Sequence, residues 1–255
     1  MTATMQALLK EIEEEPIFRQ RLAELLMKSP DPVRQPSTMT YEEFLEWADE
    51  DTLAEWVNGE IIMSSPASYW HQNVVDFLVT MLRIYVETRQ LGIICSAPFQ
   101  MKLKPAGREP DVIFLATQHL DRLKKTYLDG PADLVVEIVS PESVARDRGE
   151  KFYEYEAGGV SEYWLLDPIR TWAEFYHLNQ EGRYITAFAG KEGVYQALTI
   201  PGFWVRIEWF WQDPLPKALP ALAEIIGLAP EVLGSLLTAL GGGNEDSNTR
   251  NEHQQ

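Results

Sequence analysis

Three residues of this chain have the types and spacing of a site that cleaves phosphodiester bonds. Asp111 ends the segment Glu109-Pro110-Asp111, and Glu137 lies in the apolar run 134–139, which is typical of a strand buried on both faces. Burying a carboxylate there costs free energy unless a cation compensates it, and the hard oxygen ligands of Asp and Glu suit Mg²⁺. Lys151, further along the chain, adds a positive charge. Together these residues indicate a magnesium site beside a lysine.

The strands next to these residues must bring the two carboxylates together. A strand is expected over 112–116, directly after Asp111, and the stretch that follows has room for a turn and a return strand over 134–139. If those strands are neighbours in a central sheet, Asp111 and Glu137 lie side by side. Two other interpretations of Glu137 remain open: an ion pair with a buried arginine, and a position at the strand end in solvent.

Further helices and strands can be predicted around this pair. Asn58-Gly59 is typical of a type I′ turn and predicts a hairpin over 55–63. Thr40 and Glu43 match a capping box, which predicts a short helix over 40–48. The remaining predicted elements are helices over 3–28, 69–90, 147–157 and 215–240, and strands over 93–96, 99–103, 163–168, 171–178, 184–188 and 203–209.

The order of these elements indicates an α/β or α+β fold, in which helices flank a mixed central sheet. We expect an acidic helical extension and linker over 1–35 and one larger folded domain over 36–211. C-terminal helices are expected over 212–240. The tail over 241–255 is rich in glycine and polar residues, so we expect it to be disordered.

The composition indicates a cytoplasmic protein with little general affinity for nucleic acid. The net charge is −17, and a strongly acidic chain binds nucleic acid weakly without a specific site, because phosphate neutralisation is the main source of that affinity. No apolar run is long enough to cross a membrane, and the acidic N-terminus does not match a signal peptide. The single cysteine, Cys95, excludes an internal disulfide and fits a reducing cytoplasm.

Several motifs resemble those of a known family. The chain contains E-P-D ending at Asp111, V-V-E-I-V-S-P around Glu137, D-R-G-E-K ending at Lys151 and E-Y-W-L-L-D-P from Glu162. From about Thr40 to Trp211 the sequence resembles the bacterial putative restriction endonuclease family of the Uma type, within the PD-(D/E)XK nuclease superfamily. The resemblance implies a restriction-endonuclease-like fold and a metal-dependent nuclease activity.

The resemblance assigns metal and substrate contacts to particular residues. The superfamily's two carboxylates map onto Asp111 and Glu137, which would hold one Mg²⁺, or Mn²⁺, with the backbone carbonyl of Ile138. An early glutamate that often assists metal binding maps onto Glu60. His71 would contact a phosphate or a water molecule, and the N-terminus of its helix would lower its pKa and keep it neutral. The alternative is a helix-end histidine that only packs against its neighbours.

The candidate lysine of the site does not stand at the position that the superfamily motif predicts. The superfamily's lysine would fall on position 139, where this chain has Val139. The resemblance implies that Lys151, on the next helix, replaces it, while Lys124 and Lys125 are poorer candidates because their segment has the composition of a loop. We expect Lys151→Ala to abolish cleavage while leaving the fold and metal binding largely intact.

The expected function is therefore that of a Mg²⁺-dependent endonuclease that cleaves DNA. A homodimer is expected only by analogy with nucleases that cut two strands. Two alternatives remain open: a protein-interaction module on the same fold with an idle site, which the acidic charge favours, and a phosphoesterase for a non-nucleic substrate.

Overall fold

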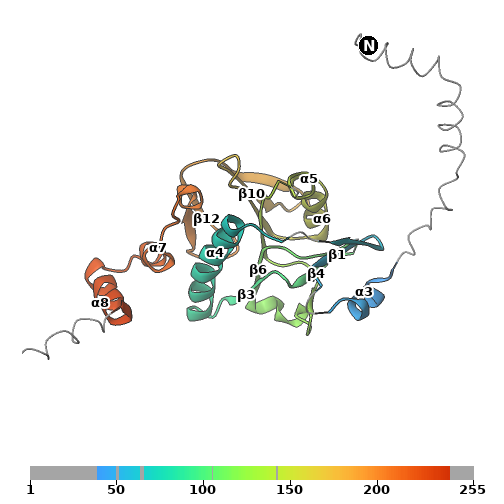
Figure 1. Ribbon diagram of the computed structural model, residues 1–255, viewed down its shortest axis with the longest axis horizontal. Helices are drawn as coiled ribbons and strands as arrows, with labels where there is room; N and C mark the ends of the chain where they lie inside the picture. The colour runs from blue at the N-terminus through green and yellow to red at the C-terminus, as the bar shows by residue number, and fades with distance from the viewer. Residues whose placement is uncertain (1–38, 50–51, 64–65, 105, 142, 242–255) are drawn as a thin grey trace, which may run out of the picture.

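The computed structural model describes residues 39–49, 52–63, 66–104, 106–141 and 143–241. In this part of the chain the expected fold class is confirmed, because mixed sheets are packed between helices in an α+β arrangement (Figure 1). The predicted helix over 3–28 and the tail from residue 242 onward lie outside the described residues. The division of the chain into domains stays a prediction. None of the described helices is long and apolar enough to span a membrane.

The larger sheet holds the strands next to Asp111 and Glu137. Its order is β11-β10-β9-β8-β6-β3; β8 and β9 run parallel, and the other neighbours run antiparallel. Asp111 directly precedes β6, so it lies beside Glu137 on the neighbouring strand, as the sequence predicts. The strands are β3 (Gly92–Ser96), β6 (Val112–Ala116), β8 (Leu134–Ile138), β9 (Glu162–Asp167), β10 (Trp172–Leu178) and β11 (Tyr184–Gly190).

One face of this sheet is covered by α4 (Tyr69–Thr88) (Figure 1). The Ser68 side chain accepts a hydrogen bond from the N–H of His71 and caps the helix. Apolar side chains one helical turn apart, such as Val74 and Leu78, pack with Val136 of β8 in the main core. The C-terminal helix α7 (Ala218–Ile225) adds to the same core.

The opposite face carries Glu137 and is covered by α5 (Val144–Arg148) and α6 (Glu150–Gly158). Successive side chains of a strand point to opposite faces, so Glu137 projects into this layer together with Val135, which packs near Tyr155 of α6. The sequence predicts one helix over 147–157. The structure has two, because Gly149 takes φ −115° and ψ −95° and interrupts the helix.

The smaller sheet contains a hairpin that lies beside the layer formed by α5 and α6. Its order is β2-β1-β5-β4-β7. The type I′ turn is confirmed, since Asn58 and Gly59 have φ values of 50° and 92°. The capping box before α3 (Tyr41–Trp47) is also confirmed. The strands are β1 (Ala54–Val57), β2 (Glu60–Met63), β4 (Gln100–Lys102), β5 (Ala106–Arg108) and β7 (Tyr127–Asp129).

The C-terminal part differs from the prediction at one strand. Only β13 (Trp204–Arg206) is extended, and a 3-10 helix over Ile207–Trp211 follows, which buries both Trp209 and Phe210. The helices predicted over 215–240 are confirmed as α7 and α8 (Pro230–Gly241), and α8 takes in the first residue of the predicted tail. The other short elements are β12 (Val194–Gln196), which pairs with β13, and a 3-10 helix over Thr117–Arg122.

Candidate active site

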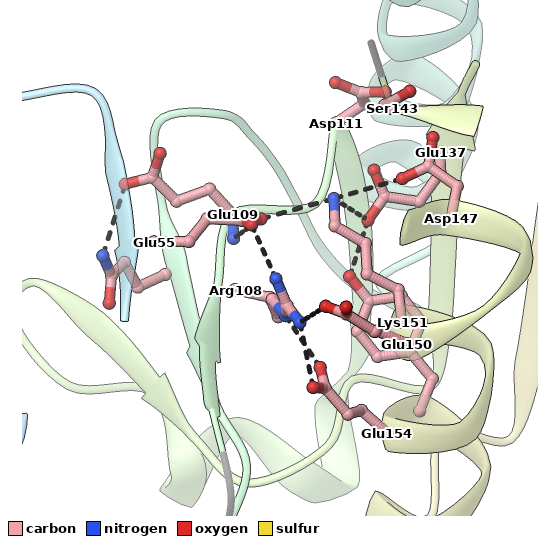
Figure 2. A network of polar contacts seen from close by, with 12 residues as sticks. Glu55, Arg108, Glu109, Asp111, Glu137, Ser143, Asp147, Glu150, Lys151 and Glu154 are labelled. Atoms are coloured by element: carbon pink, nitrogen blue, oxygen red, sulfur yellow. Dashed lines mark hydrogen bonds and ion pairs between the residues drawn. The ribbon is translucent and has the colours of Figure 1, made fainter. Parts of the chain in front are cut away.

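Lys151 lies at the centre of a buried cluster of carboxylates (Figure 2). Its Nζ atom is 3.0 Å from Oε1 of Glu137, 3.3 Å from Oε1 of Glu55 and 3.5 Å from Oδ1 of Asp147. None of these four side chains is more than 7% exposed. Burial acts to lower the pKa of Lys151, but the carboxylates, Glu137 foremost, outweigh it and raise the pKa. Lys151 is therefore a charged ammonium that neutralises buried acid.

Four elements and one loop bring these residues together. Glu55 comes from β1, Glu137 from β8, Asp147 from α5 and Lys151 from α6, while Asp111 lies in the loop before β6. Asp147 and Lys151 are four residues apart, which places them on the same side of the helical segment. All five line one cleft of about 970 Å³. The structure thus brings together the three residues with which the sequence analysis began.

Glu137 is held by two donors. Its Oε1 atom accepts a 2.6 Å hydrogen bond from the hydroxyl of Tyr155 in addition to the contact with Lys151. Burial raises the pKa of Glu137 to about 8; the negative charge of Asp147 adds to this, and Lys151 acts in the opposite direction. Glu137 therefore pairs with a lysine and a tyrosine, in place of the buried arginine or the solvent considered from sequence.

Arg108 positions Glu55. The Arg108 side chain is fully buried, and its Nη1 atom donates to Oε2 of Glu55 at 2.9 Å. Its Nε and Nη2 atoms donate to the two carboxylate oxygens of Glu154 at 2.7 Å and 2.9 Å. Burial acts to raise the pKa of Glu55, but Lys151 and Arg108 outweigh it and lower the pKa. Glu55 is therefore an ionised partner that Arg108 ties to α6.

Asp111 lies at the mouth of the cluster beside His71. Its Oδ2 atom accepts a 2.7 Å hydrogen bond from the backbone N–H of Ile138 and lies 3.2 Å from Nε2 of His71. The prediction that the pKa of His71 is lowered is wrong. Burial does act in that direction, but the hydrogen bond and the charge of Asp111 outweigh it and raise the pKa. The position of His71 in the cleft agrees with the predicted contact to substrate, which stays a prediction.

The oxygen atoms of the cluster fit a hard divalent cation in their chemistry. Both carboxylate oxygens of Asp147 are buried without a hydrogen-bond partner among the described residues, and Oδ1 forms a 3.5 Å ion pair with Lys151. Buried polar atoms in that state call for an ion or water as a partner. Asp111 and Glu137 add ligands of the type that Mg²⁺ prefers. Among the described residues, however, no three His, Cys, Asp or Glu side chains are already gathered closely enough to hold a metal ion.

Two residues that were predicted to contact the metal are Glu60 and Ile138. Glu60 is exposed at the start of β2 and does not line the cleft, so the structure does not bring it to the other candidate residues, and its role beside the metal stays a prediction. It pairs with Val57 across the turn, whereas Glu55 on β1 of the same hairpin reaches Lys151. Ile138 lines the cleft, but the backbone contact that it makes to Asp111 is through its N–H, and the metal contact of its carbonyl stays a prediction.

Sequence reasoning missed Glu55, Asp147 and Arg108. A signal was present for Asp147, because it stands four residues before Lys151 in a helix-forming segment. Glu55 shows a weaker signal as an acid within a strand-forming stretch. The alternatives Lys124 and Lys125 are exposed and lie outside the cleft, which agrees with the preference for Lys151.

Known proteins resemble this chain in sequence family and in fold. Residues 41–208 match the family model Uma2, described as a putative restriction endonuclease. A putative nuclease belonging to DUF820 from Anabaena variabilis has a similar fold, with a TM-score of 0.58 and 16% identity over 68% of this chain and 97% of that chain. No curated protein matches the sequence. Because the family model spans most of the chain and includes the whole carboxylate cluster, the chain belongs to the Uma2 family of putative restriction endonucleases.

Proposed function

We propose that this protein is a metal-dependent nuclease that hydrolyses phosphodiester bonds in DNA. The observation that carries the proposal is the convergence of Asp111, Glu137 and Lys151 in one cleft, although they come from a loop, a strand and a helix. Membership of a restriction-endonuclease family supports the same activity. Neither the metal nor the substrate follows from the fold alone, so both belong to this proposal.

The roles of the residues follow from their surroundings. Asp111, Glu137 and Asp147 would hold Mg²⁺ or Mn²⁺, because their oxygens are hard ligands and those of Asp147 lack hydrogen bonds. Bound there, the ion would lower the pKa of a water molecule and neutralise charge on the phosphate. Lys151 would stabilise the negative charge that develops on the phosphate, once its carboxylate partners have another counter-charge. Tyr155 and Arg108 hold Glu137 and Glu55 in place.

Metal titration and plasmid cleavage test the proposal together. Wild-type protein is titrated with Mg²⁺ and with Mn²⁺ by calorimetry, and nicking of supercoiled plasmid is followed under the same conditions. We expect Asp111→Asn to remove both the binding heat and the nicking. Asp121→Asn is the matched control, since Asp121 is exposed and lies outside the cleft. Metal-dependent nicking that survives Asp111→Asn would refute the assigned site.

A second candidate is a protein-interaction module with an idle site. Two observations favour it. The carboxylates around Lys151 already form ion pairs with its ammonium group, which leaves this group less able to bind a phosphate, and the net charge of the chain is −17. This candidate predicts no metal binding that depends on Asp111. The phosphoesterase alternative predicts such binding without cleavage of plasmid or of single-stranded DNA.

A further inference from the structure

The rim of the cleft is apolar and exposed. Four large hydrophobic side chains that line it are open to solvent: Tyr69 is 82% exposed, Met63 61%, Ile169 60% and Leu53 41%. They come from β2, the start of α4, the loop after β9 and the segment before β1. Single exposed apolar residues are ordinary, but several around one concave site indicate a surface that binds an apolar group.

The interior of the same cleft is acidic. Its charged lining consists of the carboxylates Glu55, Glu109, Asp111, Glu137 and Asp147 and the cations Arg146 and Lys151, with His71 beside Asp111. Burial raises the pKa of Glu109 to about 7. Lys151 is already surrounded by acid. Even with a divalent ion bound, such a lining offers little positive charge to a nucleic acid.

Arg146 is the exception among these cations. Within the described residues it has no ion pair, and its Nε atom is buried without a hydrogen-bond partner. It stands one residue before Asp147, at the same part of the cleft. A guanidinium group with unused donors presents the geometry that phosphate oxygens match in pairs. Among the described residues of the cleft, Arg146 is therefore a cation free to bind a phosphate.

We propose that the cleft takes single-stranded DNA, with a base stacked on Tyr69 and a phosphate bound by Arg146; this inference rests on the proposed nuclease function. Binding of a duplex depends on many phosphate contacts, and its bases are hidden in the stack. A single strand presents the faces of its bases, which stack on aromatic side chains without regard to sequence. An apolar rim around an acidic interior with one free arginine fits the second kind of substrate.

Tyr69 is placed to act as such a platform. It is the first residue of α4, and the Ser68 cap fixes the start of that helix through the N–H of His71. His71, two residues after Tyr69, contacts Asp111. A base on Tyr69 would thus lie on the same helical turn as a residue that reaches the proposed metal ligands.

Binding by the full-length protein tests the inference directly. A fluorescent strand of about 16 nucleotides, the upper site size of a single-strand-binding module, and its duplex are titrated with protein in the presence of a chelator, and anisotropy is recorded. We expect the single strand to bind at least about tenfold more tightly than the duplex. Tyr69→Ala should weaken single-strand binding by about 5- to 150-fold, the range for loss of one stacked base, and Tyr69→Phe should retain it.

Control variants separate these effects from a general loss of structure. Tyr153 is 66% exposed on α6 and lies outside the cleft, so Tyr153→Ala should leave binding unchanged. Arg146→Ala should weaken binding and reduce the slope of log K against log salt by about 0.7, the value for one phosphate on a single strand. Arg146→Lys should keep that slope.

The results distinguish a failure of the inference from a failure of the proposed function. Equal or tighter binding of the duplex, or equal effects of Tyr69→Ala and Tyr153→Ala, would overturn the inference. If plasmid nicking that depends on Asp111 persists in that case, the nuclease function stands. No binding of either form together with no cleavage would overturn both.

Discussion

Replacing Lys151 with methionine should destabilise the fold as well as stop cleavage. Methionine keeps most of the side-chain volume but removes the charge that faces Glu55, Glu137 and Asp147 at 3.0 to 3.5 Å. Removing one partner from a buried ion pair costs about 3–5 kcal/mol, because the remaining charge is left uncompensated. A domain is stable by only about 5–15 kcal/mol. The structure therefore revises the expectation from sequence that a Lys151 variant leaves the fold largely intact.

The loss can be measured by urea unfolding. With a slope of about 2 kcal/mol per molar urea, the cost corresponds to a midpoint about 1.5–2.5 M lower. Lys125→Met is the matched control, because Lys125 is exposed and outside the cleft; an exposed change of this kind alters stability by no more than about 0.5 kcal/mol. Equal midpoints for the Lys151 and Lys125 variants would refute the view that Lys151 neutralises buried acid.

The same variant should respond to pH and to metal. Without Lys151, the pKa of Glu137 loses the main influence that lowers it, so the folded state holds a proton that the unfolded state releases above about pH 4.5. Stability therefore falls as pH rises. The pKa of Glu137 is already about 8 in the wild type, so both proteins hold this proton below pH 8, and the deficit of Lys151→Met should be larger at pH 9 than at pH 6. Mg²⁺ at about 100 times its dissociation constant should restore about 2.7 kcal/mol. A deficit that is the same at both pH values would contradict this account.

Four further predictions concern positions other than Lys151. Arg108→Met should cost about 3–5 kcal/mol by denaturant unfolding, since Arg108 is fully buried between Glu55 and Glu154. Arg183→Met, whose side chain is 73% exposed, is the control and should cost under about 1 kcal/mol. Gly107→Ala should destabilise by about 1–3 kcal/mol, because its Cβ would lie 2.4 Å from the Tyr41 ring. Gly234→Ala in α8, where nothing lies within 4 Å, should stabilise by about 0.5–1 kcal/mol. Burial acts to raise the pKa of Glu162, but the contact with His177 and the hydrogen bonds from Tyr195 and the Thr199 N–H outweigh burial and lower the pKa. Its stabilisation is present above pH 4.5 and is lost as pH falls through the lowered pKa, so the stability difference between wild type and Glu162→Gln should shrink between pH 5 and pH 3. A thermal-unfolding difference that stays constant over this range would contradict that assignment.

The local patterns of the sequence predict much of the central fold. The apolar run around Glu137 predicts β8, and Asn58-Gly59 and the Thr40 capping box predict the hairpin and α3. These features depend on residues close together in the chain. They can be predicted without the tertiary structure, because their physical causes act locally. These causes are side-chain alternation, positive φ and helix capping.

The partners in the site are harder to predict because they depend on tertiary packing. Glu60 and Glu55 stand in the same hairpin, and only the position of β1 against β5 decides which of them reaches Lys151. The pKa of His71 likewise depends on Asp111, forty residues later, more than on its own helix. Short strands such as β5 and β7 hold three residues each, too few for alternation to predict.

Arg108 also determines when the cleft can form. It joins Glu55, 53 residues earlier, to Glu154, 46 residues later. Contacts between distant parts of a chain form late in folding, because the entropy of closing long loops must first be overcome. A fragment that ends before α6 lacks both Lys151 and the acid that holds Arg108. The part of the cluster that contains Glu55 therefore requires β1, β5 and α6 to have met. Local opening of the β1–β2 hairpin would separate Glu55 from Lys151 and Arg108, while Glu137 and Asp147 stay beside Lys151.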